Sequence, residues 1–121
     1  MYTAIILKDE DHNRLLQALQ PIIPVGWEIL AHHMTINMGS AKQGPAAERL
    51  NEEVILVVKS FAINNKVCAV GVLTNVPSNN KIKHITLAVN RSNGGKPMHS
   101  NDLVDWEPHE SLVLHGIVKE V

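Results

Sequence analysis

Apolar positions follow two different periods along this chain, and each period predicts a different element. Residues 2–8, "YTAIILK", are β-branched and apolar, which is typical of a buried strand. The next segment places Leu15 and Leu19 at helical spacing behind an acidic cluster at 9–11, and Pro21 ends the pattern. The first twenty residues therefore predict a strand followed by a helix.

The remainder of the chain predicts strands separated by polar loops. Strands are expected at residues 32–38, at 53–75 as two strands joined by the turn residues Asn64 and Asn65, at 84–90 and at 111–121. Residues 91–102 are rich in Gly, Ser and Asn and predict a surface loop. The pattern predicts an α+β fold with about six mostly antiparallel strands and one main helix, in a single domain over residues 1–121.

Two of these strands contain the same unusual sequence. "HMTI" begins at His33, and "HITL" begins at His84. Because alternate side chains of a strand point to opposite faces, His33 and Thr35 share one face, and His84 and Thr86 share one face of the other strand. The apolar residues between them face the core. If the two strands lie side by side, two imidazoles and two hydroxyls converge on one site.

This set of side chains suits acid–base chemistry at phosphorus. Histidine, with an ordinary pKa of ~6.5, gives or takes a proton near neutrality, so one imidazole can act as base and the other as acid. Threonine hydroxyls can bind the phosphoryl oxygens. We therefore expect His33, Thr35, His84 and Thr86 to be catalytic, with no metal and no cofactor. Which histidine is the acid stays open.

The paired motifs resemble the signatures of the two-histidine (2H) phosphoesterase superfamily. That superfamily includes the RNA-ligase-like cyclic phosphodiesterases, the phosphodiesterase domain of fungal tRNA ligases, and compact phage and bacterial members. "YTAIILKDEDHNRLL" is similar to the opening strand and helix of the compact branch, and "GKPMHSNDLVDW" to the loop after its second motif. The resemblance implies a compact bilobal fold in which the two motifs face each other across a central cleft. It also implies a metal-independent phosphodiesterase acting on 2′,3′-cyclic phosphates, 2′-5′ linkages or cyclic nucleotides.

Four residues outside the motifs are candidates for binding the substrate. Lys96 and Ser100 lie in the glycine-containing loop 91–102 and can reach phosphate oxygens if that loop contacts the substrate. Tyr2 and Trp106 carry rings that can stack on a nucleobase. Core packing of the rings and solvation of the loop are the alternative interpretations.

The other histidines are expected to have structural or surface roles. In a regular strand His32 points away from His33, and His99, His109 and His115 lie in the loop and final strand. A metal site built from His33 and His84 with Glu107 or His109 is an alternative. The sequence contains neither a His-Glu-x-x-His motif nor a cysteine pair that would favour it.

Charge and composition narrow the partners. Eleven basic and twelve acidic side chains give a net charge of −1, which disfavours long duplex nucleic acid and leaves a small nucleotide or RNA end as the expected partner. The single Cys68 and the lack of a long apolar run predict a cytoplasmic protein without membrane contact. Nothing in the pattern indicates an oligomeric state.

Several functions remain open at this stage. The substrate is either an RNA end, with a 2′,3′-cyclic phosphate or 2′-5′ linkage, or a cyclic oligonucleotide signal. A non-catalytic module that binds nucleotides or RNA ends in the same cleft is the main alternative. A structural protein whose histidines tune an interface with pH is a third.

Overall fold

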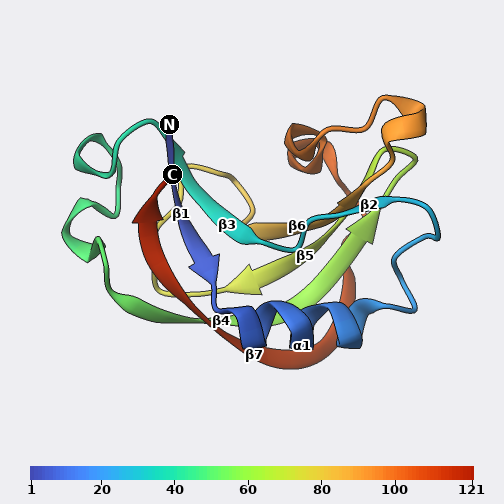
Figure 1. Cartoon of the computed structure of the whole chain (residues 1–121), viewed down its shortest axis with the longest axis horizontal. Coiled ribbons are helices and arrows are strands. Elements are labelled where there is room, and N and C mark those ends of the chain that lie inside the picture. Colours follow the sequence, from blue (N-terminus) through green and yellow to red (C-terminus); the bar gives the residue numbers. More distant parts are fainter.

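A computed structural model describes residues 1–121 and shows seven strands joined in one sheet (Figure 1). The elements in chain order are β1 (Tyr2–Leu7), α1 (Asp9–Leu19), β2 (Glu28–Ile29), β3 (His33–Met38), η1 (Ala41–Gln43), η2 (Ala47–Arg49), β4 (Glu53–Ile63), β5 (Val67–Leu73), β6 (His84–Val89), η3 (Arg91–Asn93), η4 (Pro97–Asp102) and β7 (Glu107–Glu120). All strand pairs are antiparallel. The prediction of mostly antiparallel strands with one main helix is confirmed.

Six of the strands close into a barrel. Their order is β6-β3-β1-β7-β4-β5, and β5 pairs back with β6 to complete the ring. The expectation of two lobes is therefore wrong. The segment between the two motifs consists largely of the β4–β5 hairpin, and this hairpin continues the same sheet around the barrel instead of building a second lobe.

Strand alternation fills the inside of the barrel with apolar side chains. On β4, Val54, Leu56 and Val58 are buried, while Ile55 between them is exposed. The helix α1 adds Leu15 and Leu19 to the same core, and its polar face stays in solvent. Burial of this apolar surface is the main term that stabilises the barrel.

A second, smaller apolar cluster lies apart from the main core. Its buried members are Ala62 from β4, Val67 and Ala69 from β5, Val89 from β6, and Leu103. Trp106 packs against it. The segment 91–106, which includes η3 and η4, therefore packs against β5 and against β6, the strand that carries the second motif. The predicted surface position of residues 91–102 is confirmed, because most of them are exposed, and packing of Leu103 and Trp106 holds the segment against the barrel.

Other differences from the predicted elements are local. The short strand β2 lies between the predicted helix and the strand predicted at 32–38, where the sequence analysis places no strand, and β7 begins at Glu107 and not at residue 111. The early start follows from pairing, because Glu107 and Pro108 lie opposite Phe61 and Ser60 of β4 across a register shift. None of the helices is long and apolar enough to cross a membrane.

Candidate active site

The two motif strands are hydrogen-bonded neighbours in the barrel. β3 pairs with β6 with Met34 opposite Ile85, and both of these side chains are fully buried in the main core. In this antiparallel register Thr35 lies opposite His84. The alternating polar residues of both strands therefore face outward from the barrel, side by side on one face.

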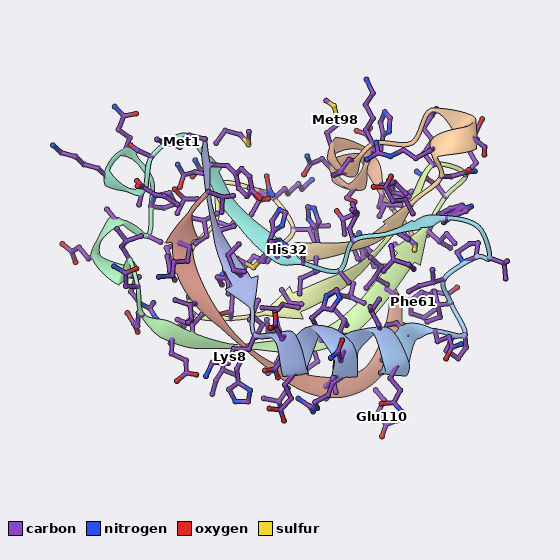
Figure 2. All side chains as sticks on the ribbon, viewed as in Figure 1. Met1, Lys8, His32, Phe61, Met98 and Glu110 are labelled. Atoms are coloured by element: carbon purple, nitrogen blue, oxygen red, sulfur yellow. The ribbon has the colours of Figure 1, made fainter.

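These polar residues line a pocket of about 920 Å³ on the outside of the barrel. Its wall combines β1, β3 and β6 with the 79–80 loop and η4, and consists of Tyr2, Leu30, His32, His33, Thr35, Asn37, Met38, Asn79, Asn80, His84, Thr86, Pro97, Met98 and Asn101. Figure 2 shows Met98 at the top of the view, with His32 between it and α1. The four motif residues named from the sequence are thus brought together in one pocket.

A break between β2 and β3 changes the direction of His32. Both strands pair with the same edge of β6, and Ala31 between them has a left-handed φ of 53°. The Nδ1 of His12 on α1 lies 2.8 Å from the carbonyl oxygen of Ala31 and ties the break to the helix. The regular alternation assumed from the sequence therefore fails here. His32 lines the pocket, with its Nδ1 3.1 Å from the Nδ1 of His33.

His33 is neutral at neutral pH. Burial is the largest cause that lowers its pKa, and repulsion from the His32 and His84 imidazoles lowers it further, to about 4. The ring of Tyr2 lies 5.0 Å from the His33 ring, centroid to centroid, and covers it from β1. His33 is therefore suited to accept a proton, provided that the ring nitrogen facing the reacting atom is the unprotonated one.

The orientation of His84 is fixed by a backbone contact. Its Nδ1 donates a hydrogen bond to the carbonyl oxygen of Ile82 at 2.8 Å, since a carbonyl can only accept. Nδ1 therefore carries the proton, and Nε2 is the nitrogen left to exchange a proton. The side chain is 8% exposed. Near-complete burial of both imidazoles would support the third alternative, a structural protein with pH-tuned histidines, but His33 is only partly buried.

The Thr86 hydroxyl is hydrogen-bonded to a buried serine behind the pocket wall. Its Oγ1 lies 2.8 Å from the Oγ of Ser100, and Ser100 is 2% exposed. Ser100 belongs to η4, so this bond also ties η4 to β6. Ser100 itself lies outside the lining and can influence the pocket only through its hydrogen bond to Thr86, whereas both threonines line the pocket directly.

The remaining candidates occupy different places. Tyr2 is in the pocket wall, whereas Lys96 is exposed and outside the lining, and its backbone N–H donates to His99 Nδ1 at 3.0 Å. Trp106 packs on β5, where a ring carbon would lie 3.4 Å from a Cβ at Gly71. It too is outside the lining.

The residues named for a metal site do not come together. Glu107 and His109 lie on β7, and His109 packs edge-on against Phe61, away from the two motif histidines. No group of three or more His, Cys, Asp or Glu side chains is arranged to hold a metal ion.

Asparagines in the lining are the residues that sequence reasoning missed. Asn37 lies beyond a register shift in the β1–β3 pairing, opposite the buried Thr3, and is 4% exposed, so simple strand alternation does not place it in the wall. Asn79 and Asn80 come from the loop before β6, and Asn101 comes from η4. The sequence carries no periodic signal for these three.

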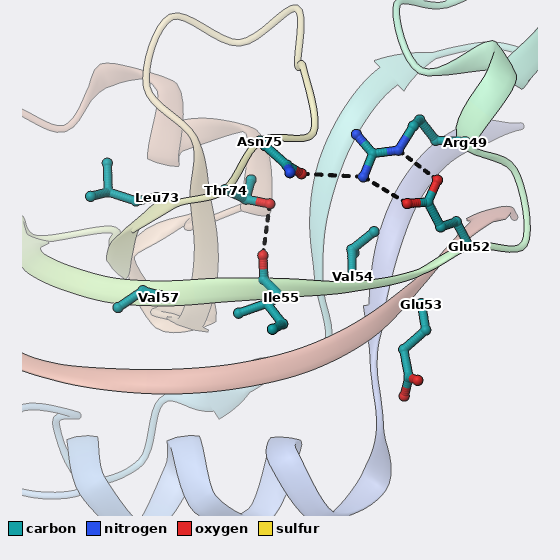
Figure 3. Close-up of a pocket in the computed structure, with 9 residues that line it drawn as sticks. All are labelled: Arg49, Glu52, Glu53, Val54, Ile55, Val57, Leu73, Thr74 and Asn75. Carbon is teal, nitrogen blue, oxygen red and sulfur yellow. Dashed lines mark hydrogen bonds and ion pairs between the residues drawn. The ribbon is translucent and has the colours of Figure 1, made fainter.

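A second hollow lies on another part of the surface (Figure 3). It has a volume of about 620 Å³ and is lined by residues of β4, of the end of β5 and of the segments next to them. Its one guanidinium, on Arg49, is paired with Glu52 at 2.6 Å and also donates to Asn75 Oδ1 at 3.2 Å. With this cation already engaged and no histidine in the wall, the hollow offers no acid–base pair.

A comparison with known protein families identifies the class to which this chain belongs. The family model of the fungal tRNA ligase phosphodiesterase domain matches residues 17–119, and the chain belongs to this family. Membership implies a cyclic phosphodiesterase, an activity of the hydrolase kind. No curated protein matches the chain. Placement in a phage or bacterial branch stays a prediction.

Proposed function

We propose that the chain hydrolyses a cyclic phosphodiester of a nucleotide, without a metal, with the two motif histidines as acid and base. The observation that carries this proposal is the convergence of His33, Thr35, His84 and Thr86 on one pocket. Residues 51 apart in sequence, by the numbers 84 − 33, share this pocket because their strands are neighbours.

We assign the base to His33 and the acid to His84. His33 is unprotonated at neutral pH because its pKa is about 4, so it can take a proton from water as the water oxygen bonds to phosphorus. His84 acts as the doubly protonated imidazolium: its Nδ1 proton stays hydrogen-bonded to the Ile82 carbonyl oxygen, and its Nε2 proton goes to the departing ribose oxygen. One P–O bond forms and one breaks, and the proton gained by His33 balances the proton lost by His84.

The two threonines are proposed to hold the phosphoryl group. Their hydroxyls are neutral donors that can bind the non-bridging oxygens as charge develops in the transition state. The Oγ of Ser100 can accept the Thr86 hydroxyl or donate to it. In the proposed role Ser100 donates, and Thr86 keeps its own proton for the phosphate.

Hydrolysis of a 2′,3′-cyclic mononucleotide with excess chelator tests the proposal. We expect turnover by the wild-type chain and a loss of about 10²–10⁴-fold in kcat for His33→Ala and for His84→Ala. His109→Ala, a histidine outside the pocket, is the matched control and is expected to keep wild-type activity. Binding of cyclic and 2′-5′ substrates with no turnover would instead support the non-catalytic module.

A further inference from the structure

We propose that the pocket selects a substrate whose negative charge is confined to the reacting phosphodiester, and that it discriminates against a nucleotide with a further phosphate on the ribose 5′ position. This inference rests on the proposed function, because it names the substrate class of the same pocket. It is carried by the chemical composition of the pocket wall.

The polar part of the wall is neutral apart from its histidines. Of the lining residues, none is Lys, Arg, Asp or Glu. Four are asparagines, at positions 37, 79, 80 and 101, and they come from β3, the loop before β6, and η4. His33 is itself neutral above its pKa of about 4 and adds no charge at neutral pH.

Cations on the neighbouring segments are engaged elsewhere or lie outside the wall. The Nζ of Lys83 donates to the carbonyl oxygen of Thr74 at 2.9 Å, and Arg91 is paired with Glu28 at 2.5 Å. Lys81 and Lys96 are exposed and outside the lining. No fixed positive side chain therefore faces the interior of the pocket.

Such a wall treats one phosphate and two phosphates differently. A single phosphodiester anion can be bound by the threonine hydroxyls and by an imidazole that is protonated during the reaction. A second phosphate carries close to two further charges, and it loses hydration on entry without meeting a cation. The amides of Asn79, Asn80 and Asn101 fit neutral donors and acceptors instead, such as the edges of a nucleobase or ribose hydroxyls. The amide of Asn37 is buried and donates to backbone carbonyl oxygens, so it is left out of this set.

The first test compares two substrates that differ at one position. Adenosine 2′,3′-cyclic phosphate and its 5′-phosphorylated form are hydrolysed in parallel at low ionic strength. We expect the added phosphate to lower kcat/KM by about threefold or more. Lys81→Ala and Lys96→Ala are expected to leave this ratio unchanged. An equal or higher kcat/KM for the 5′-phosphorylated substrate would overturn the inference.

The second test adds the missing charge. Asn79→Lys and Asn101→Lys place a cation on the two sides of the wall, and we expect at least one of them to raise kcat/KM for the 5′-phosphorylated substrate by about two- to fivefold relative to the other substrate. Asn13→Lys adds the same charge on α1, outside the pocket, and is expected to leave the ratio unchanged. A ratio that moves equally in all three variants would overturn the inference.

Binding measurements separate this inference from the proposed function. Both nucleotides are titrated by calorimetry into His33→Ala, or into the wild-type chain if it shows no turnover. Weaker binding of the 5′-phosphorylated nucleotide supports the inference even where hydrolysis is absent. Equal or tighter binding of it, or binding of neither nucleotide, would overturn the inference even where other phosphodiesters are hydrolysed.

Discussion

Three imidazoles share the pocket, and their surroundings give them different properties. His33 is covered by Tyr2 and lies beside both other histidines, so its protonated form is disfavoured. The Nδ1 proton of His84 is held by a carbonyl, which leaves one nitrogen for chemistry. His32 is exposed and contacts His33 through Nδ1, and we expect it to orient the His33 ring.

The lowered pKa of His33 predicts the pH dependence of activity. A base works in its unprotonated form, so kcat/KM is expected to stay high as the pH falls through ~6.5 and to decline only near pH 4. The groups that face His33 are His32 from the strand break, His84 from β6 and Tyr2 from β1. A pH–rate profile from pH 3.5 to 8 measures this. An acid limb centred at ~6.5 would contradict the assignment of His33 as base.

A variant without the His32 imidazole tests the cause of the lowered His33 pKa. His32→Ala eliminates one source of repulsion, so the pKa of His33 and the acid limb are expected to move upward. Because burial is the largest cause of the lowered pKa, the limb should stay below ~6.5. His99→Ala, which changes a histidine of η4 outside the lining, is expected to leave the limb in place.

At the scale of elements, the site depends on a strand break and on one packed segment. The alternation of apolar and polar residues in "HMTI" and "HITL" is sufficient to predict which side chains face the core, and the burial of Met34 and Ile85 agrees with it. The same alternation gives the wrong direction for His32, because the left-handed Ala31 interrupts the strand. A left-handed alanine has no local sequence signal, since Gly and Asn are the residues typical of that conformation.

The course of residues 91–106 was equally inaccessible from local pattern. Its Gly, Ser and Asn content correctly predicts a surface segment. The same content gives no sign that Leu103 and Trp106 pack the segment onto β5 and β6 and bring Asn101 into the pocket wall. Long-range packing of a few apolar residues decides its position. Lys96 and Ser100 were named as phosphate-binding candidates from this loop, and the packing leaves both outside the lining.

The close approach of Gly95 predicts that this segment is sensitive to one methyl group. A Cβ there would lie 2.2 Å from the backbone oxygen of Lys66 and 2.8 Å from the backbone nitrogen of Asn90. Gly95→Ala is therefore expected to shift the segment, to lower the free energy of unfolding by about 1–3 kcal/mol and to raise KM. Urea denaturation and steady-state kinetics measure the two effects. Ser92→Ala, at an exposed position of η3, is the control, and equal behaviour of both variants would contradict this packing role.

At the scale of the molecule, the closed barrel joins both apolar clusters through shared strands. β4, β5 and β6 each contribute residues to the main core and to the smaller cluster around Leu103. A closed ring also leaves no exposed edge along these strands. The two clusters should therefore unfold together.

Tryptophan fluorescence reports this coupling, because Trp27 packs against the main core and Trp106 against the smaller cluster. We expect Trp27→Phe and Trp106→Phe, each of which leaves one tryptophan, to give urea transitions that coincide with the circular-dichroism transition of the same variant. If the Trp106 signal of Trp27→Phe changed at a lower urea concentration than its circular dichroism, the segment 91–106 would be an independently opening unit.

β6 closes the barrel by pairing with β3 on one side and with β5 on the other, and this closure limits which fragments of the chain can form the pocket. The residues of the pocket wall run from Tyr2 to Asn101, so no contiguous fragment of half the chain length contains the complete wall. The proposed activity therefore requires the closed barrel, and neither half of the chain is expected to have it alone. Because β5 pairs with β6, a mutation in β5 that disturbs this pairing can displace His84 and lower the activity without changing either motif histidine.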